Sequence, residues 1–486
     1  MNTLIVLQIG ISSFFELDNL YQVFVTRNKM LFVDDETEFS QKLSLFDYGL
    51  KVINRDSVIE VCLLSDKVLD ERTLFVFDMN VKEIKVEVKR TVYQMLSRFF
   101  KPLSKWGILV GIRPVKLVHE MLDDGLSLDL IRDVLSDKYF IHPEKVALMT
   151  EIALRERPHL VPNDISAISL YLCIPFCPTR CLYCSFPSND LKQKGKRLPE
   201  YLEKLAAETI HAVNHIYRLG KKVDCIYIGG GTPTSIDESQ LDALLGMIKS
   251  HVNLADVKEY TVEAGRPDTI TRKKLEIMKK NGVNRICINP QTMNEQTLVT
   301  IGRAHDAKSI VDVMKMAKEI GFKTINMDLI IGLPGETVHH TSDTLDKIIE
   351  LAPENITIHT LAVKRASRLH EDLDYYELTH DQMVEEMMDD AELKLRKHGL
   401  TPYYMYRQKK MVGHLENVGY AISGHESLYN MRIMEEKHSI VACGAGAVSK
   451  ICAPEENRFE RVANFKGLED YLDRFDEILL KKEILE

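Results

Sequence analysis

Residues 170–186 read Leu170-Tyr171-Leu172-Cys173-Ile174-Pro175-Phe176-Cys177-Pro178-Thr179-Arg180-Cys181-Leu182-Tyr183-Cys184-Ser185-Phe186. The apolar beginning is typical of a buried strand, and the spacing Cys177-x3-Cys181-x2-Cys184 places three thiolates on one tight loop after it. Only this register fits, because a motif begun at Cys173 would need its third cysteine where Arg180 stands. Three thiolates can hold three irons of a [4Fe–4S] cluster and leave the fourth iron open. The stretch therefore predicts an iron–sulfur site at the end of a strand.

Zinc is the main alternative for this loop. A structural zinc site needs a fourth close ligand, and neither Ser185 nor Phe186 can supply one. Cys173 could, but it precedes the loop on the predicted strand. We therefore rank zinc well below an iron–sulfur cluster, and a chance grouping of cysteines lower still.

The composition indicates a soluble, multidomain protein of the reducing cytoplasm. A chain of 486 residues with 45% hydrophobic and 28% charged residues predicts two or three domains. Its net charge of −9 offers no global basic field for nucleic acid or an anionic membrane. Nine cysteines, an odd number, do not suggest a disulfide scaffold. The apolar run at residues 4–15 lacks a basic leader and is too short to span a membrane, so we expect a buried strand there.

A regular alternation of strands and helices follows the cysteine motif. Glycines or capping residues flank the helical patterns between the strands. Six such units predict right-handed crossovers and a parallel sheet, and they are too few for a closed eight-stranded barrel. We therefore expect an α/β fold built on a partial (β/α)6 barrel, with its chemistry at the carboxyl ends of the strands. Apolar runs that predict these strands occur at 168–174, 223–229, 258–264, 284–289, 323–331 and 355–361.

Composition and pattern change twice along the chain. Residues 1–160 carry short strand-like runs and then helical patterns, which predicts a small N-terminal α+β domain of unknown role. Prolines 158 and 162 mark the passage into the barrel, which we place at 161–375. Residues 376–486 begin with a helical pattern at 380–397 and end with an amphipathic segment near 466–482. We expect this last part to form a C-terminal cap that covers the substrate.

Polar or glycine-rich motifs stand at successive ends of the predicted strands. The turn Gly229-Gly230-Gly231-Thr232-Pro233-Thr234 would allow backbone to approach a ligand closely, because glycine has no Cβ atom. Glu263 could accept hydrogen bonds from an ammonium group or from hydroxyls. Asp328 lies inside an apolar run, where a carboxylate needs a partner such as a ribose diol. Arg303 offers a fork for a carboxylate, and Gln291 follows the fourth strand.

These strings together resemble the oxygen-independent coproporphyrinogen III oxidase (dehydrogenase) family of the radical S-adenosylmethionine (SAM) superfamily. The resemblance is close over residues 165–375. It is carried by the cysteine motif, the Gly-Gly-Gly-Thr-Pro-Thr turn, Gly282-Val283-Asn284-Arg285, and Asp328-Leu329-Ile330 followed by Gly332-Leu333-Pro334. The tail, with Tyr404-Met405-Tyr406-Arg407-Gln408-Lys409 and Gly444-Ala445-Gly446-Ala447, resembles the branch of Gram-positive bacteria that also carries an N-terminal extension.

The resemblance implies a [4Fe–4S] cluster and SAM as cofactors. By motif, Cys177, Cys181 and Cys184 match the cluster ligands. Tyr171, Gly230 and Glu263 match positions that hold the cluster-bound SAM. The positions that match contacts of a second SAM are Tyr183, Gly231, Thr232, Gln291, Arg303, Asp328 and Ala362. In this superfamily one electron cleaves SAM to methionine and a 5′-deoxyadenosyl radical.

The resemblance further implies a reaction in haem and porphyrin biosynthesis. Two propionates of coproporphyrinogen III would undergo oxidative decarboxylation to vinyl groups, which gives protoporphyrinogen IX. An electron donor such as flavodoxin or ferredoxin would be a partner, whereas nucleic acid would not. Because the chain is acidic and this substrate carries four carboxylates, positive charge must be local. We suggest as its source Arg180, Lys364, Arg365, Arg407 and Lys409.

The chain departs from the family pattern at two places, which keeps two other readings open. The best-studied branch has a fourth cysteine where Ser185-Phe186 stands, and a histidine where Cys173 stands. Haem-chaperone relatives share the ending Tyr183-Cys184-Ser185-Phe186, but they typically carry a C-terminal His-Asn-x-x-Tyr-Trp string. This chain has no His-Asn pair and a single tryptophan, Trp106, which we expect in a core. A radical SAM enzyme acting on another tetrapyrrole is the third reading.

Overall fold

A computed structural model describes residues 2–12, 15–111, 113–186, 188–408, 411–453 and 458–483. The chain divides into two compact units, Met1–Thr150 and Glu151–Glu486. Helix α6 (Pro143–Leu160) runs through this division, close to the predicted boundary at 160. None of the helices in the described ranges has the length and apolar character needed to cross a membrane.

The N-terminal unit is built on a five-stranded mixed sheet in the order β2-β1-β3-β4-β5. Strand β1 pairs in parallel with β2 and β3, whereas β3, β4 and β5 are antiparallel. A two-residue turn, Asp56-Ser57 with both φ angles positive, joins β3 to β4 as a tight hairpin. The strands span Leu4–Ile9 (β1), Met30–Val33 (β2), Tyr48–Arg55 (β3), Val58–Leu64 (β4) and Val68–Phe75 (β5).

Helix α3 (Val81–Leu96) covers one face of this sheet, and its buried residues join the core formed by β1, β3 and β4. The helix begins at Val81 because Asn80 caps it, accepting hydrogen bonds from the amides of Lys82 and Glu83. Trp106 is buried, as predicted. The other helices are α1 (Leu17–Tyr21), α2 (Glu36–Lys42), α4 (Pro114–Asp123) and α5 (Leu128–Asp133).

The C-terminal unit contains the predicted row of six parallel strands, in the order β6-β9-β10-β11-β12-β13. Each apolar run expected from the sequence coincides with one of them, so the α/β partial barrel is confirmed. Both faces of such a row are covered, which explains the nearly continuous hydrophobic runs. The strands span Ala167–Ile174 (β6), Lys222–Gly230 (β9), Glu259–Gly265 (β10), Arg285–Gln291 (β11), Thr324–Ile331 (β12) and Asn355–Thr360 (β13).

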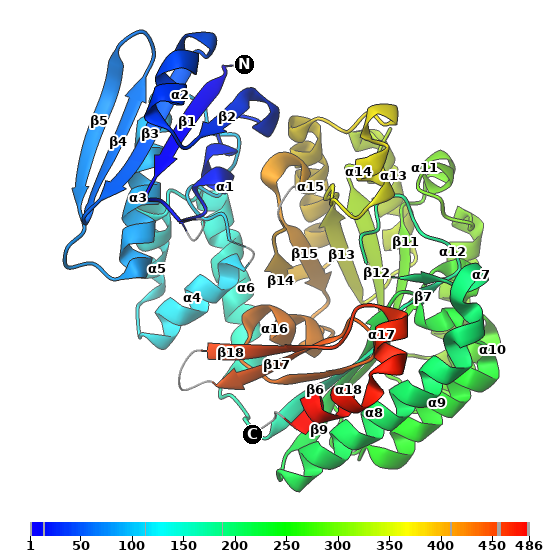
Figure 1. The fold of residues 1–486 in the computed structure, drawn as a ribbon. Helices are drawn as coiled ribbons and strands as arrows, with labels where there is room; N and C mark the ends of the chain where they lie inside the picture. The colour runs from blue at the N-terminus through cyan, green and yellow to red at the C-terminus, as the bar shows by residue number, and fades with distance from the viewer. Residues whose placement is uncertain are drawn as a thin grey trace. The chain divides into compact units, whose positions relative to one another are not determined.

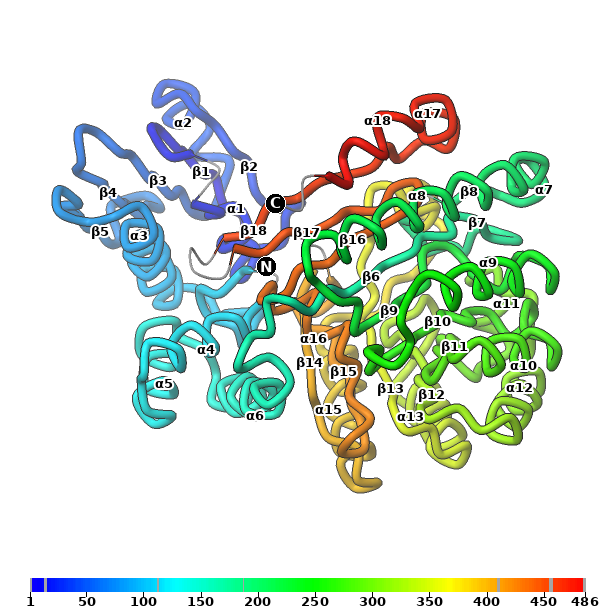
Figure 2. The backbone as a smooth tube through the Cα atoms, turned by 90° about the horizontal axis from the view of Figure 1, so that it is seen from below, coloured from blue at the N-terminus to red at the C-terminus, as the bar shows by residue number. Residues whose placement is uncertain are grey.

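Helices connect these strands and lie along the outside of the curved row (Figure 2). The predicted signals operate as expected at their ends. Asp237 and Gln240 form a reciprocal capping box, the Thr271 side chain accepts a hydrogen bond from the Lys274 amide, and Gly321 ends a helix with a φ of 80°. The helices are α8 (Leu198–Arg218), α9 (Glu238–His251), α10 (Arg272–Lys280), α11 (Glu295–Thr300), α12 (Ala307–Ile320) and α13 (Val338–Glu350), with the short α7 (Leu191–Lys194) and α14 (Arg368–Glu371).

The segment that we expected as a separate cap extends the same sheet at both edges (Figure 1). Strands β14 (Thr401–Tyr406) and β15 (Asn417–Ala421) are antiparallel and join β13, whereas β16 (Ile440–Cys443) pairs in parallel with β6. The sheet then ends with β17 (Val448–Ala453) and β18 (Arg458–Ala463). Strands from both sides of the predicted boundary at 375 therefore belong to one continuous sheet. The helices here are α15 (Asp381–Lys397), α16 (Leu428–Glu435), α17 (Leu468–Asp473) and α18 (Phe475–Leu480).

Candidate active site

A cavity of about 570 Å³ lies at the carboxyl ends of the parallel strands, within the C-terminal unit. Its size falls in the range of small-molecule and cofactor sites. Every cofactor residue selected from the sequence lines it: Tyr171, Cys177, Cys181, Tyr183, Cys184, Gly230, Gly231, Thr232, Glu263, Gln291, Arg303, Asp328 and Ala362. The structure thus brings together in one place residues that come from all six strand ends.

The cysteine loop has little regular structure of its own and is fixed by contacts with its surroundings. Its first residues form the short strand β7 (Phe176–Cys177), which pairs with β8 (Asn189–Asp190). Further along, the Leu182 amide donates to the Ile301 carbonyl at 3.1 Å, and the Leu182 carbonyl accepts from the Leu369 amide at 2.9 Å. The Leu182 side chain is buried in an apolar cluster with both partners. These contacts hold the thiols of the motif at the edge of the cavity.

The donor set of this loop fits an iron–sulfur cluster. Burial raises the pKa of the Cys177 and Cys184 thiols, and a bound metal cation would favour their thiolate form. The Thr232 hydroxyl lies 3.5 Å from the Cys177 Sγ and donates to it. Cys173 does not line the cavity; it packs against Ala442 and Ala447, and burial raises the pKa of its thiol to about 12. Among the described residues, Cys173 therefore adds no fourth thiolate to the loop.

The glycine turn after β9 packs tightly against the start of the cysteine loop. Gly230 has a φ of 111°, and a Cβ atom there would lie 2.8 Å from the Cys173 Sγ. At Gly231 a Cβ atom would lie 2.5 Å from the Phe176 carbonyl oxygen. Any larger residue would displace the loop, so this close approach requires both glycines, and at Gly230 the positive φ favours glycine as well.

Glu263 is a buried carboxyl group among aromatic rings. It accepts a hydrogen bond from the Tyr227 hydroxyl at 2.6 Å, and burial raises its pKa to about 7. The rings of Tyr171, Tyr227 and Tyr429 stack beside it, with centroids 4.3 to 6.1 Å apart. A carboxylate inside an aromatic wall suits a ligand that carries an ammonium or sulfonium charge.

Asp328 has the hydrogen-bonding partners that its buried position demands. It accepts from the Asn326 side chain at 2.7 Å, and the His359 Nε2 lies 3.7 Å from its other oxygen. Burial alone would raise the pKa of Asp328, but the contacts with His359 and Asn326 hold it below its ordinary value. His359 Nδ1 in turn lies 3.2 Å from the Tyr406 hydroxyl. Asp328 is therefore an ionised acceptor at the cavity wall.

His359 and Tyr406 line the cavity, and the sequence reasoning did not single them out. A signal for His359 was present. In β13 the apolar residues Ile356 and Ile358 alternate with Thr357 and His359, so one face of this strand is polar. Tyr406 gave no such signal, because it reaches the site through β14, which we did not predict.

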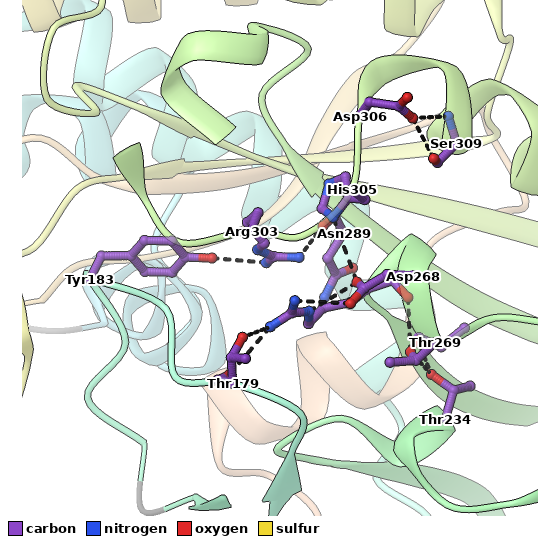
Figure 3. Close-up of polar contacts among 12 residues, drawn as sticks. Thr179, Tyr183, Thr234, Asp268, Thr269, Asn289, Arg303, His305, Asp306 and Ser309 are labelled. Atoms are coloured by element: carbon purple, nitrogen blue, oxygen red, sulfur yellow. Dashed lines mark hydrogen bonds and ion pairs between the residues drawn. The ribbon is translucent and has the colours of Figure 1, made fainter. Parts of the chain in front are cut away.

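Arg303 has protein partners on both terminal nitrogens, which differs from our expectation of an open fork. One donates to the Tyr183 hydroxyl at 2.9 Å and the other to the Asn289 carbonyl at 3.0 Å (Figure 3). Within the described part of the chain, four buried atoms of cavity-lining side chains have no hydrogen-bond partner: Asn289 Oδ1, Gln291 Oε1, Arg303 Nε and Gln408 Oε1. Buried polar atoms without partners are costly, so this wall fits a polar ligand such as a nucleoside.

The five basic residues suggested for the substrate separate into three groups. Arg180 and Lys364 line the cavity. Arg365 and Arg407 are not among the lining residues in the described ranges; Arg407 is buried and donates to the His414 carbonyl at 3.0 Å. Lys409 lies outside the described residues. Only Arg180 and Lys364 therefore remain as candidates that the structure places at the cavity.

The sequence comparisons agree with the class of protein that this fold and site define. Residues 171–348 match the model of the radical SAM superfamily. Members of this superfamily use a [4Fe–4S] cluster and SAM, so these are the cofactors of this protein. The solved structure of Escherichia coli coproporphyrinogen III oxidase (HemN), described as a radical SAM enzyme, is similar in fold. It has a TM-score of 0.52 and 23% identity, covering 67% of this chain and 72% of that one.

Individual relatives show to which family of this superfamily the chain belongs. The chain is 40% identical over 407 residues to the Bacillus subtilis (strain 168) oxygen-independent coproporphyrinogen-III oxidase-like protein HemZ, covering 82% of this chain and 81% of that protein. It thus belongs to the family of oxygen-independent coproporphyrinogen-III oxidase-like radical SAM proteins, as the motifs predicted. The heme chaperone HemW of the same organism is 33% identical over 290 residues, covering 57% of this chain and 70% of that protein.

Proposed function

We propose that this protein catalyses the anaerobic oxidative decarboxylation of coproporphyrinogen III propionates to vinyl groups, forming protoporphyrinogen IX. The observation that carries the proposal is a single cavity that joins the three-thiol loop, the polar strand ends and the basic residues Arg180 and Lys364. The identity to the oxidase-like relative over most of both chains supports it. For each propionate, the β-carbon loses a hydrogen atom, carbon dioxide leaves, and one electron passes to an acceptor.

We assign the cofactor roles by motif, and the common cavity that these residues line supports the assignment. Cys177, Cys181 and Cys184 hold the cluster, and when bound, the cluster and SAM supply a carbon-centred radical that removes a hydrogen atom. For the cluster-bound SAM, the residues are Tyr171, Gly230 and Glu263, with the Glu263 carboxylate accepting from the ammonium group. A second SAM would be held by Tyr183, Gly231, Thr232, Gln291, Arg303, Asp328 and Ala362.

The remaining wall suits a tetrapyrrole with acidic side chains. Tyr404 and Tyr406 offer aromatic surface to a macrocycle, while Lys364 and Arg180 offer positive charge to its carboxylates. The Lys364 side chain is partly buried beside the cavity, and this burial lowers the pKa of its amine. A carboxylate bound there gains more from the charge than it would at the surface.

A haem-binding chaperone is the second candidate, favoured by the 33% identity to HemW. A carrier would bind haem tightly and need no cleavage of SAM. The C-terminal His-Asn-x-x-Tyr-Trp string of those relatives has no counterpart in this chain, whose single tryptophan, Trp106, is buried in the N-terminal unit. Radical chemistry on another tetrapyrrole is the third candidate.

The experiment that separates these candidates is anaerobic. The cluster is reconstituted, SAM, a reductant and coproporphyrinogen III are added, and vinyl products and 5′-deoxyadenosine are measured. We expect both. Formation of 5′-deoxyadenosine without loss of carbon dioxide would redirect the substrate to another tetrapyrrole, and tight haem binding without cleavage of SAM would favour the carrier. Cys177→Ala is the inactive control, and Cys62→Ala, in the N-terminal unit, is the matched cysteine control.

We also propose flavodoxin or ferredoxin as the electron donor and the cytoplasm as the location. Both proposals follow from the chemistry of the cluster, which needs low-potential electrons and reduced thiols. The nine cysteines are free in the structure, which is consistent with such a compartment. Reduction of the reconstituted cluster by a flavodoxin or ferredoxin system, followed by its EPR signal, tests the donor.

A further inference from the structure

Arg266 is a buried arginine directly behind the cysteine loop for which neither the motifs nor the proposed reaction gives a role. It follows β10, its side chain is 4% exposed, and it borders the cavity. Its Nη1 donates to Thr179 twice, to the hydroxyl at 2.6 Å and to the carbonyl at 3.3 Å. Thr179 stands midway between Cys177 and Cys181, so this guanidinium reaches the centre of the loop.

The other side of the same guanidinium is locked by Asp268. Nε and Nη2 donate to its two carboxylate oxygens at 3.0 and 2.9 Å, a bidentate pair. His305, whose side chain is fully buried, lies 3.7 Å from the same carboxylate. Burial would raise the pKa of Asp268, but His305 and Arg266 hold it well below its ordinary value, so Asp268 is charged. Figure 3 shows Thr179, Asp268 and His305 gathered near Tyr183 and Arg303.

The backbone that carries this pair is fixed as well. The Thr269 hydroxyl donates to the Arg266 carbonyl at 2.9 Å, and the Thr269 amide donates to it at 3.0 Å. The Thr234 side chain, from the turn after β9, contacts the Thr269 hydroxyl at 2.6 Å. Protein contacts therefore hold the guanidinium in place. Its Nη1, which Asp268 does not use, is directed at the loop and can orient it.

We propose that Arg266, locked by Asp268, is a positioning residue that holds the cysteine loop in the geometry that binds the cluster. The loop lacks regular structure around Thr179, so its conformation depends on side-chain contacts such as this one. Because the charges of Arg266 and Asp268 nearly cancel, the role is mainly geometric. Groups that support metal ligands in this way typically change metal affinity 10- to 100-fold when removed.

The test measures retention of the cluster, which is independent of the proposed substrate. Arg266→Lys keeps the charge but cannot hold Asp268 with a fork and reach both oxygens of Thr179. We expect the anaerobically reconstituted variant to release iron to a chelator about tenfold faster than the wild type. Arg272→Lys is the matched control, because Arg272 lies in an exposed ion pair with Glu319, and we expect no change there.

Two milder variants keep the test decisive if Arg266→Lys fails to fold, which circular dichroism would reveal. Thr179→Val removes the hydroxyl acceptor and keeps the shape, whereas Thr179→Ser keeps the hydroxyl. We expect faster iron release for valine and near wild-type release for serine, with unchanged melting of the cluster-free proteins. Wild-type retention in both Arg266→Lys and Thr179→Val, or equal loss in the two Thr179 variants, would overturn the proposal. Since no substrate is present, failure here would leave the proposed decarboxylation untouched.

Discussion

Two walls of the cavity hold their functional side chains in different ways. The loop wall, residues 177–186, is irregular, and contacts from Arg266, Arg303 and Leu369 fix it. The strand wall, formed by the ends of β10, β12 and β13, is rigid through its sheet, and neighbours tune its carboxylates. Glu263 is pushed toward neutrality by burial, whereas Asp328 is kept ionised by its partners. The positions of the loop-wall residues depend on contacts with neighbouring side chains and backbone. The protonation states of the strand-wall carboxyl groups depend on burial and on nearby charges.

The largest effect should come from removing a ligand of the loop wall. We expect Cys181→Ser to lose the cluster after reconstitution and to reduce cleavage of SAM to background, because two thiolates cannot hold the cluster in an open-iron state. Iron and sulfide content and 5′-deoxyadenosine formation measure this. Cys62→Ser serves as the control. A Cys181→Ser protein with a full cluster would show that the loop wall uses another ligand.

The strand wall should respond in affinity and leave the cluster content unchanged. We expect Glu263→Gln to weaken SAM binding roughly 10- to 100-fold, since a hydrogen bond to a charged group is lost. Equilibrium binding of SAM to the reconstituted protein measures this. Glu276→Gln, at an exposed position on α10, is the matched control. Loss of the cluster in Glu263→Gln would contradict the division between the two walls.

The same carboxyl group should make SAM binding depend on pH. Glu263 faces the Tyr227 hydroxyl, Asp328 and His359, and its pKa is about 7. Below that pH the carboxyl group is protonated and is a poor hydrogen-bond acceptor for an ammonium group. Above that pH the carboxylate is present and accepts well. We expect SAM affinity to rise roughly tenfold from pH 6 to pH 8, and the dependence to flatten in Glu263→Gln. An affinity that falls over this range would show that another group controls binding.

The smallest effect should come from Tyr406, which lies at the end of β14 and contacts His359 of the strand wall. Tyr406→Phe removes the hydroxyl that contacts His359 and keeps the ring, so we expect a roughly two- to tenfold decrease in the efficiency of SAM cleavage. Steady-state formation of 5′-deoxyadenosine at several SAM concentrations measures it. Tyr375→Phe, at a largely exposed tyrosine, is the control. No difference between the two variants would remove Tyr406 from the functional wall.

The sequence predicts most of the strand wall because its residues stand in or directly after apolar runs, although His359 was missed. Glu263 and Gln291 could be located from strand ends, since parallel strands share one carboxyl edge, and Asp328 from its place inside an apolar run. Arg266 illustrates what could not be predicted. Its partner Thr179 is 87 residues earlier, and no local pattern reports that contact.

Short antiparallel strands and arginine partners were the other gaps. β14 contains Pro402 and β15 is only five residues long with Gly419 at its centre, so the sheet extension at β13 and the approach of Tyr406 were missed. Arg407 lies at the end of this region, and its sequence gave no indication that the guanidinium would be buried against the His414 carbonyl. A basic residue near a loop is a candidate for substrate binding, but the direction in which its side chain points depends on the fold.

The parallel pairing of β16 with β6 has a consequence for the order in which the site is made. The cysteine motif leaves the ribosome directly after β6, whereas the strand that covers the outer edge of β6 is made only after the rest of the barrel. Until then that edge has unpaired amide and carbonyl groups, and Gly446, Ala447 and Val448 have not yet closed their part of the cavity. The growing chain therefore exposes its metal-binding thiols long before the cavity around them is complete.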